Sequence, residues 1–141
     1  MACSFASPAS SFSLSGSEAP GNYTPRPMAP RPFDGGGNIF SYLSNARAAN
    51  YSARRTVIAG VCASACTMKL SIRNACIEPD ATLLFHQASY NGSRSELATR
   101  VMLFAYPRKI RDWVLRSGAL NSTALTELSG RSAIAMGVRS C

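Results

Sequence analysis

The fold is decided by residues 56–67, which read TVIAGVCASACT. The first six residues form a short apolar run rich in β-branched side chains, which is typical of a buried strand. Small residues then surround Ser64, and residues 64–72 predict a buried helix that begins at this serine. The stretch therefore predicts a strand that turns directly into a helix.

The segments on either side continue this alternation of helix and strand. Residues 38–50 carry apolar side chains at helical spacing, and residues 81–85 form a second apolar run that ends at His86. Strands alternating with helices imply βαβ crossovers. We therefore expect an α/β fold with a small, mainly parallel sheet.

The last third of the chain is expected to be helical. One apolar stripe ends at Pro107, and a second is closed by Gly118. A third helix, capped by Asn121 or Ser122, is predicted to carry Leu125 and Leu128. Asn91-Gly92 predicts a turn before these helices.

The chain divides into two parts by composition. Residues 1–33 hold six of the eight prolines and a cluster of serines, so we expect a disordered leader. Its small residues near the start resemble the end of an export signal. Residues 34–141 form the expected globular domain.

Composition excludes several classes of protein. The net charge is +8, but the basic residues are scattered, with doublets only at Arg54-Arg55 and Arg108-Lys109, which argues against nucleic-acid binding. No run is apolar and long enough for a membrane span. A single histidine and widely spread cysteines argue against a metal site, and we expect no cofactor.

Three features carry candidate chemistry. The glycines 35–37 precede a helix and can present backbone N–H groups to an oxyanion, with Gly36 and Gly37 as the expected donors. Ser64 lies at a helix start, where the helix dipole favours a developing negative charge. His86 ends a strand and can act as a general base. Each also has a structural interpretation: a flexible linker, a helix cap and a hydrogen-bonded histidine.

The order of these features resembles the Clp protease proteolytic subunit and its relatives in the Clp/crotonase superfamily. The matching residues are DGGGN at 34–38, ASA at 63–65 and LFHQ at 84–87. The separations are 27 residues from Gly37 to Ser64 and 22 from Ser64 to His86. The cysteines around Ser64 look more like the small, predicted-exported bacterial members. The resemblance implies a Ser64 nucleophile, a His86 base and a peptide or small acyl substrate, and relatives of this kind form oligomers.

The family's third catalytic residue is an aspartate, and this chain has Leu125 at the corresponding position. Asp112 and Glu127 are the candidate replacements. A Ser–His dyad, a substitute acceptor or an inactive site are the alternatives.

Four cysteines lie in the globular part, which fits two disulfides and a periplasmic or secreted location. One pairing that could work joins Cys66 to Cys76 and Cys62 to Cys141. Buried reduced thiols are the alternative. A catalytic cysteine, Cys62 or Cys66 beside Ser64, is a further alternative, although nothing in the sequence indicates a lowered pKa.

Three functions follow as hypotheses. The first is a serine hydrolase of the peptidase type that uses Ser64 and His86. The second is an inactive binding or assembly protein with the same fold. The third is a crotonase-like acyl-CoA enzyme, in which the glycine turn would polarise a thioester carbonyl.

Overall fold

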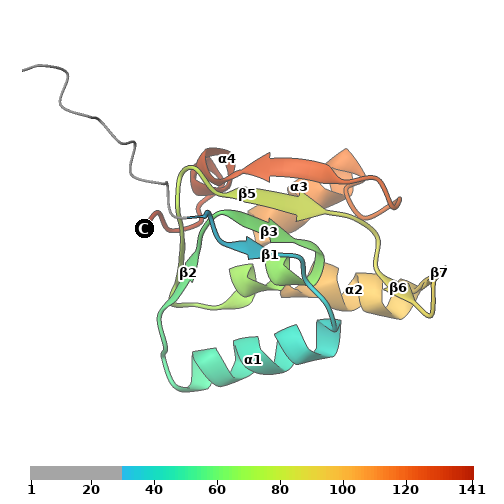
Figure 1. Ribbon diagram of the computed structural model, residues 1–141, viewed down its shortest axis with the longest axis horizontal. Coiled ribbons are helices and arrows are strands. Elements are labelled where there is room, and N and C mark those ends of the chain that lie inside the picture. Colours follow the sequence, from blue (N-terminus) through green and yellow to red (C-terminus); the bar gives the residue numbers. More distant parts are fainter. Residues whose placement is uncertain (1–29) are drawn as a thin grey trace, which may run out of the picture.

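The structure, a computed structural model, describes residues 30–141 (Figure 1). Helices and strands alternate along this part of the chain. Their order is β1 (Phe33–Asp34), α1 (Ile39–Tyr51), β2 (Thr56–Ile58), β3 (Val61–Ala63), the 3-10 helix η1 (Ser64–Ser71), β4 (Ala75–Ile77), β5 (Thr82–Phe85), β6 (Ser89–Tyr90), β7 (Ser93–Arg94), α2 (Glu96–Ala105), α3 (Arg108–Ser117), β8 (Thr126–Ser129) and α4 (Gly130–Ala135).

Four strands form the main sheet, in the order β1-β3-β5-β8. The first three run parallel, and β8 runs antiparallel to β5. A separate parallel pair joins β2 to β4, and β6 and β7 form a hairpin. The expected α/β class with a small, mostly parallel sheet is confirmed. The parallel order also places the carboxyl ends of β1, β3 and β5 at one edge of the sheet (Figure 1).

The single strand expected over residues 56–61 is two strands. Gly60 separates them with a φ of +62°, a left-handed conformation that glycine adopts without strain. A side chain there would also collide with the backbone of Pro32. The break lets β2 pair with β4 while β3 enters the main sheet between β1 and β5.

The prediction of a helix around Leu125 and Leu128 is wrong. Residues Thr126–Ser129 form strand β8 instead. Leu128 is buried opposite Leu83, whereas Leu125 lies outside the strand and is 60% exposed. Without β8, the outer edge of β5 would leave backbone N–H and C=O groups unpaired.

The other predicted helices are present. Asn38 caps α1, because its side chain accepts hydrogen bonds from the N–H groups of Phe40 and Ser41. Pro107 separates α2 from α3, and Gly118 ends α3 in the left-handed conformation. The Asn91-Gly92 turn joins β6 to β7, with positive φ at both residues.

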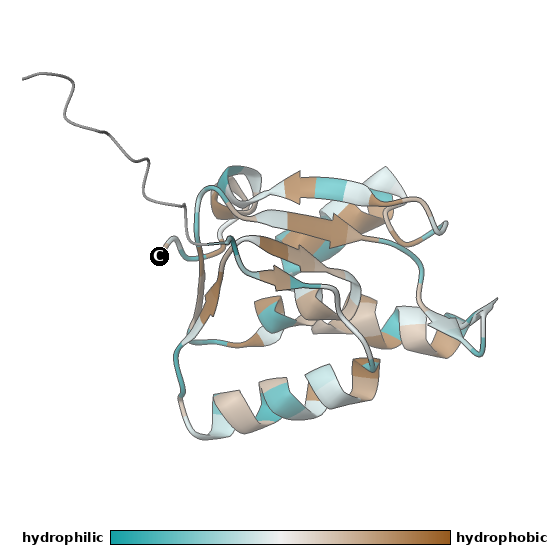
Figure 2. Ribbon diagram, in the orientation of Figure 1, coloured by the Kyte–Doolittle hydropathy of each residue, from teal (hydrophilic) through white to brown (hydrophobic). Residues whose placement is uncertain are grey.

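The core forms where α2 and α3 meet the main sheet. Phe85 is fully buried, and its ring meets those of Tyr106 and Trp113 edge to face, at centroid distances of 5.5 and 5.3 Å. Figure 2 shows hydrophobic residues concentrated along the strands of the main sheet, while α1 is of mixed polarity. This packing fixes the strand ends that carry the candidate site.

The described chain begins just before β1. Phe33, which composition places in the leader, pairs with Val61, and the carbonyl of Pro32 accepts from Val61 N–H. The rest of the expected leader, residues 1–29, lies outside the described residues. Across residues 30–141, the helices are too short or too polar to cross a bilayer.

Candidate active site

The sheet brings the three candidate features to one edge. In the register of β1 with β3, Asp34 pairs with Cys62, so the glycine turn continues alongside Ser64. In the register of β3 with β5, Ala63 pairs with Leu84, so Ser64 and His86 both lie just beyond the paired strands. Neighbouring strands are about 5 Å apart. Ligand sites of open α/β sheets form at this carboxyl edge.

Ser64 adopts a conformation that is rare for its residue type. Its φ is +57°. It directly follows strand β3 and is the first residue of η1. The left-handed region costs a non-glycine residue about 1–2 kcal/mol. Ser64 is partly exposed, and its hydroxyl has no hydrogen-bond partner within residues 30–141. The turn thus presents an unengaged hydroxyl at the sheet edge.

Two linked hydrogen bonds connect the Ser64 turn to the core. The Thr67 hydroxyl donates to the Ser64 carbonyl at 2.7 Å. That leaves the Thr67 oxygen as the acceptor for Tyr106, whose hydroxyl lies 2.7 Å away. Burial raises the pKa of Tyr106 well above its ordinary value, more than the hydrogen bond with Thr67 lowers it. Tyr106 therefore stays a neutral donor and fixes the Ser64 carbonyl through Thr67.

Gly36 packs directly on the Ser64 turn. Its φ is +83°, and a Cβ there would lie 2.7 Å from the Ala63 oxygen and 2.8 Å from the Ala65 nitrogen and the Ser64 Cβ. Only a residue without a side chain permits this approach. The first parallel strand thereby places its glycine turn against the serine.

Gly36, one of the two expected oxyanion donors, has a hydrogen-bond partner of its own. Its N–H donates to the Asp34 carboxylate at 3.0 Å, so it is already engaged. The N–H of Gly37 has no acceptor within residues 30–141, and Ala65, as the second residue of η1, has no partner inside that helix. The amides of Gly37 and Ala65 are therefore unengaged within residues 30–141.

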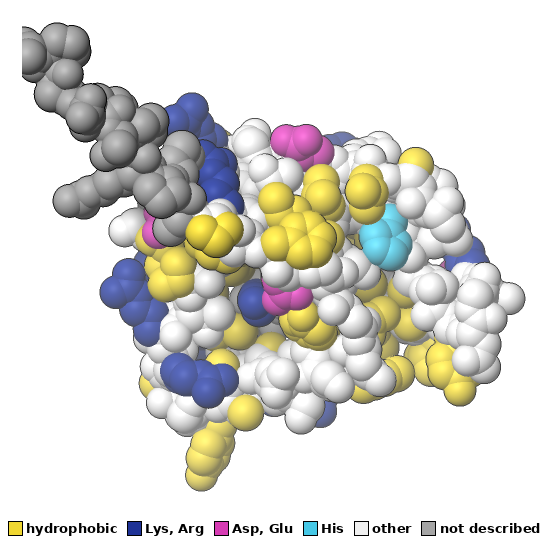
Figure 3. Space-filling view, in the orientation of Figure 1, with side chains coloured by type: hydrophobic (Ala, Val, Ile, Leu, Met, Phe, Trp, Pro, Cys, Tyr) yellow, Lys and Arg dark blue, Asp and Glu magenta, His cyan; other side chains and the backbone are white. Residues whose placement is uncertain are grey.

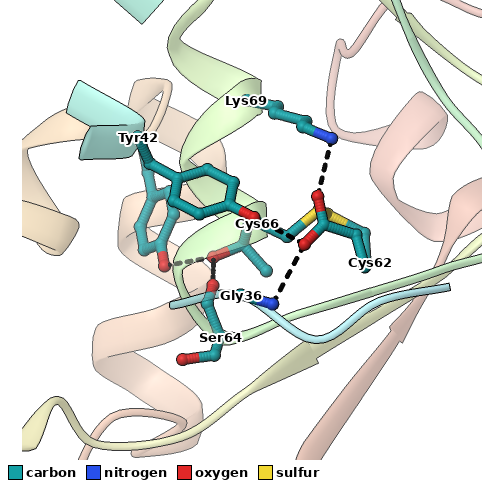
Figure 4. Close-up of a disulfide and its surroundings, with 9 residues drawn as sticks. Gly36, Tyr42, Cys62, Ser64, Cys66 and Lys69 are labelled. Atoms are coloured by element: carbon teal, nitrogen blue, oxygen red, sulfur yellow. Dashed lines mark hydrogen bonds and ion pairs between the residues drawn. A yellow bond between two sulfur atoms is a disulfide. The ribbon is translucent and has the colours of Figure 1, made fainter. Parts of the chain in front are cut away.

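A cluster of polar side chains supports the glycine turn (Figure 4). Asp34 accepts from Tyr42 at 2.6 Å and from the Lys69 ammonium at 2.8 Å, in addition to Gly36 N–H. Burial alone would raise the pKa of Asp34. The hydrogen bonds from Lys69, Tyr42 and Gly36 and the charge of Lys69 outweigh it and hold the pKa below its ordinary value. Asp34 is thus a carboxylate that anchors Gly36.

Tyr42 gives this cluster a signature at high pH. Burial, followed by the hydrogen bond to Asp34 and the charge of that carboxylate, raises the pKa of Tyr42 to about 12. The folded protein therefore holds this proton more tightly than the unfolded chain, whose tyrosine has a pKa near 10. This contribution to stability is complete below pH 10 and is lost as the pH rises from 10 towards 12.

We expect Tyr42→Phe to lower the free energy of unfolding at neutral pH by about 1–2 kcal/mol, because the Asp34 carboxylate loses a donor. The difference from the wild type should shrink between pH 10 and 12, since only the wild type can lose this proton. Urea unfolding across this pH range is the measurement. Tyr51→Phe, at a side chain that is 96% exposed, is the control. A difference that stays constant with pH would contradict the prediction.

His86 holds its imidazole in one tautomer. Nδ1 lies 2.7 Å from the carbonyl of Gln87, and a carbonyl can only accept, so Nδ1 carries the proton. Nε2 then has a free lone pair. The chain's one histidine lies at the surface beside hydrophobic side chains (Figure 3). This is the tautomer that a general base needs.

Neither candidate acid forms a hydrogen bond with His86 in the structure. Glu127 is exposed on β8, opposite Leu84, and Asp112 lies on α3. Within residues 30–141 neither carboxylate hydrogen-bonds to the imidazole, whose partner is the Gln87 carbonyl. A backbone carbonyl therefore stands where a triad would place a carboxylate.

The four cysteines form two disulfides, but the expected pairing is wrong. Cys62 bonds to Cys66 across the Ser64 turn, with their Cα atoms 5.3 Å apart. Cys76 bonds to Cys141. The second pairing arises because the end of the chain lies along β4, where Cys141 N–H donates to the Ile77 carbonyl. The alternative of reduced thiols, and with it a catalytic cysteine beside Ser64, does not hold in this structure.

A cavity of about 350 Å³ adjoins the glycine turn. Its walls come from the start of α1, the β6–β7 hairpin and the start of α2. The lining residues are Gly37, Asn38, Ile39, Phe40, Ser89, Tyr90, Ser95, Leu97 and Ala98. Since Gly37 carries one of the available amides, a group bound to that amide would have a mainly apolar space beside it.

Comparison of the chain with protein-family models and with curated protein sequences found no match.

Proposed function

We propose that the protein is a serine hydrolase of the peptidase type, acting on a peptide or small acyl substrate. The observation that carries the proposal is the left-handed Ser64 at the end of β3, packed against Gly36 and next to the strand that ends in His86. The resemblance to the Clp/crotonase superfamily supports the same assignment and favours a peptide.

The chemistry follows from the free groups. Ser64 Oγ attacks the acyl carbon while His86 Nε2 takes the hydroxyl proton. The N–H groups of Gly37 and Ala65 stabilise the oxyanion. Collapse of the tetrahedral intermediate breaks the bond to the leaving group, which takes the proton from His86. Water then attacks the acyl group on Ser64 while His86 takes a proton from the water. Collapse of this second intermediate releases the acid, and Ser64 recovers its proton from His86. The acyl side of the substrate occupies the cavity beside Gly37.

The Gln87 carbonyl orients His86 but is uncharged, so it stabilises an imidazolium less than a carboxylate would. We therefore propose a Ser–His dyad with slower turnover than a full triad provides. The two disulfides fit an oxidising environment, and we place the protein in the periplasm or outside the cell.

An alkyl fluorophosphonate probe, located by peptide mass spectrometry, tests the proposal. We expect labelling at Ser64, none in Ser64→Ala, and labelling slowed by a factor of about 100 or more in His86→Ala, because a general base contributes about 10²–10⁴. Ser44→Ala, on the exposed side of α1, is the matched control and should label like the wild type.

A folded wild type that does not react, or a His86→Ala variant that reacts at the wild-type rate, would contradict serine catalysis. The inactive binding protein would then be the better hypothesis, since the pairing of His86 Nδ1 with a carbonyl instead of an acid also favours it.

A further inference from the structure

Ser64 lies at the centre of a small covalent ring. Cys62, in β3, and Cys66, in the first turn of η1, are four positions apart in the sequence and are joined by a disulfide (Figure 4). The ring thus ties the strand before the turn to the helix after it. Ser64, whose φ is +57°, is the middle residue of this ring.

The packing of the core does not require this disulfide. Cys62 and Cys66 are only 2% and 1% exposed, so two small apolar side chains would fill the same space. A ring this short also restricts the unfolded chain less than a long one does. Cys76–Cys141, which spans 65 residues, is the bond that restricts the unfolded chain most. The short ring therefore calls for a local explanation.

The conformation of Ser64 supplies that local explanation. The hydrogen bond from Thr67 holds only the carbonyl of Ser64, and Gly36 excludes bulk on one side without bonding to the serine. A left-handed serine would relax towards ordinary φ values if the surrounding structure permitted it. The disulfide limits that relaxation because it fixes the chain two residues before and two residues after the turn.

We propose that the Cys62–Cys66 disulfide positions the Ser64 nucleophile, so that full reactivity of the site requires this pair to be oxidised. The inference rests on the proposed hydrolase function for its consequence in activity, but the positioning of the turn can be measured separately. A cavity of about 320 Å³, lined in part by Asp34, Cys62, Cys66 and Lys69, gives a small reductant a route to the bond.

The chain supplies its own matched control in the second disulfide. We compare Cys62→Ala/Cys66→Ala with Cys76→Ala/Cys141→Ala, measuring the rate constant and the apparent binding constant for fluorophosphonate labelling. The first variant should react at least about tenfold more slowly at saturating probe with little change in binding, because the serine leaves its conformation while the acyl cavity remains. The second should react within about twofold of the wild type, although it unfolds more easily.

Reduction tests the same bond without changing its residues. In the Cys76→Ala/Cys141→Ala background, Cys62–Cys66 is the one disulfide left within residues 30–141. Dithiothreitol passes two electrons and two protons to the pair, yielding two cysteine thiols and the cyclic disulfide of the reagent. We expect labelling to slow to the rate of the Cys62→Ala/Cys66→Ala variant and to recover on reoxidation. An equal loss of labelling in both double variants, or no effect of reduction once mass spectrometry shows it complete, would overturn the proposal.

Amide hydrogen exchange separates this inference from the proposed function. If the wild type does not label at all, the hydrolase proposal fails, and exchange over residues 61–68 still measures the turn. We expect exchange there to accelerate about tenfold or more in the Cys62→Ala/Cys66→Ala variant and to change little in the other. Equal exchange over this segment in both variants would overturn the positioning role.

Discussion

Gly36→Ala is expected to abolish labelling of Ser64 and to lower the free energy of unfolding by about 2–4 kcal/mol. A left-handed φ costs alanine about 1 kcal/mol relative to glycine. Its Cβ would also meet three atoms of the Ser64 turn at 2.7–2.8 Å, two of which belong to the backbone. Relieving such overpacking typically costs about 1–3 kcal/mol more. The glycine turn and the serine would have to separate, which moves the Gly37 amide away from the nucleophile while the Ala65 amide stays beside it.

Labelling kinetics and urea unfolding are the measurements. Removing an oxyanion donor typically costs a factor of about 10²–10³, so the loss of labelling should exceed the effect of lower stability. Gly137→Ala is the matched control, because Gly137 also has a positive φ, +100°, but a Cβ there meets nothing within 4 Å. It should cost about 1 kcal/mol and leave labelling unchanged. A labelling rate in Gly36→Ala close to that of the control would contradict the packing argument.

The sequence predicts strands around β3 and β5 because each is reached through a continuous apolar run. Residues 81–85 are such a run, and helix α1 has both apolar spacing and a capping Asn38. Strand β8 could not be predicted in this way. Leu125 and Leu128 have the spacing of a helix, and the need of the β5 edge for a partner appears only after the sheet has formed.

The candidate site shows the same division between local and long-range information. Ser64 and His86 can be selected from the sequence because each directly follows an apolar run that ends at the carboxyl edge. The Lys69–Asp34 pair, 35 residues apart in the chain, has no local signal. The bond from Tyr42 to Asp34 has no local signal either. The sequence therefore does not indicate that the Gly36 amide is engaged by Asp34 while the Gly37 amide is free.

The cysteine pairing depends on register in the same way. Cys62 and Cys66 meet because a strand turns sharply into a helix between them. Cys141 reaches Cys76 because residues 139–141 run along β4, with the Arg139 carbonyl accepting from Ile77 N–H at 2.8 Å. Neither contact can be inferred from the spacing of the cysteines along the sequence.

The Cys76–Cys141 bond should contribute most of the disulfide stability. In the chain-entropy description, closing a loop that spans 65 residues is worth about 4 kcal/mol, against about 2 kcal/mol for a loop that spans four. We therefore expect Cys76→Ala/Cys141→Ala to lose about twice as much free energy of unfolding as Cys62→Ala/Cys66→Ala. A loss of about 4 kcal/mol corresponds to a fall in Tm of roughly 15 °C for a domain of this size.

Urea unfolding of both double variants under non-reducing conditions measures the two contributions, and reduced wild type should lose roughly their sum. A larger loss from the short ring than from the long one would show that native-state contacts around Ser64, and not the unfolded chain, dominate its energetics. The expected order of stability is the reverse of the order expected for reactivity: the bond that matters less for folding matters more for the nucleophile. That opposition lets one pair of variants separate a stabilising disulfide from a positioning one.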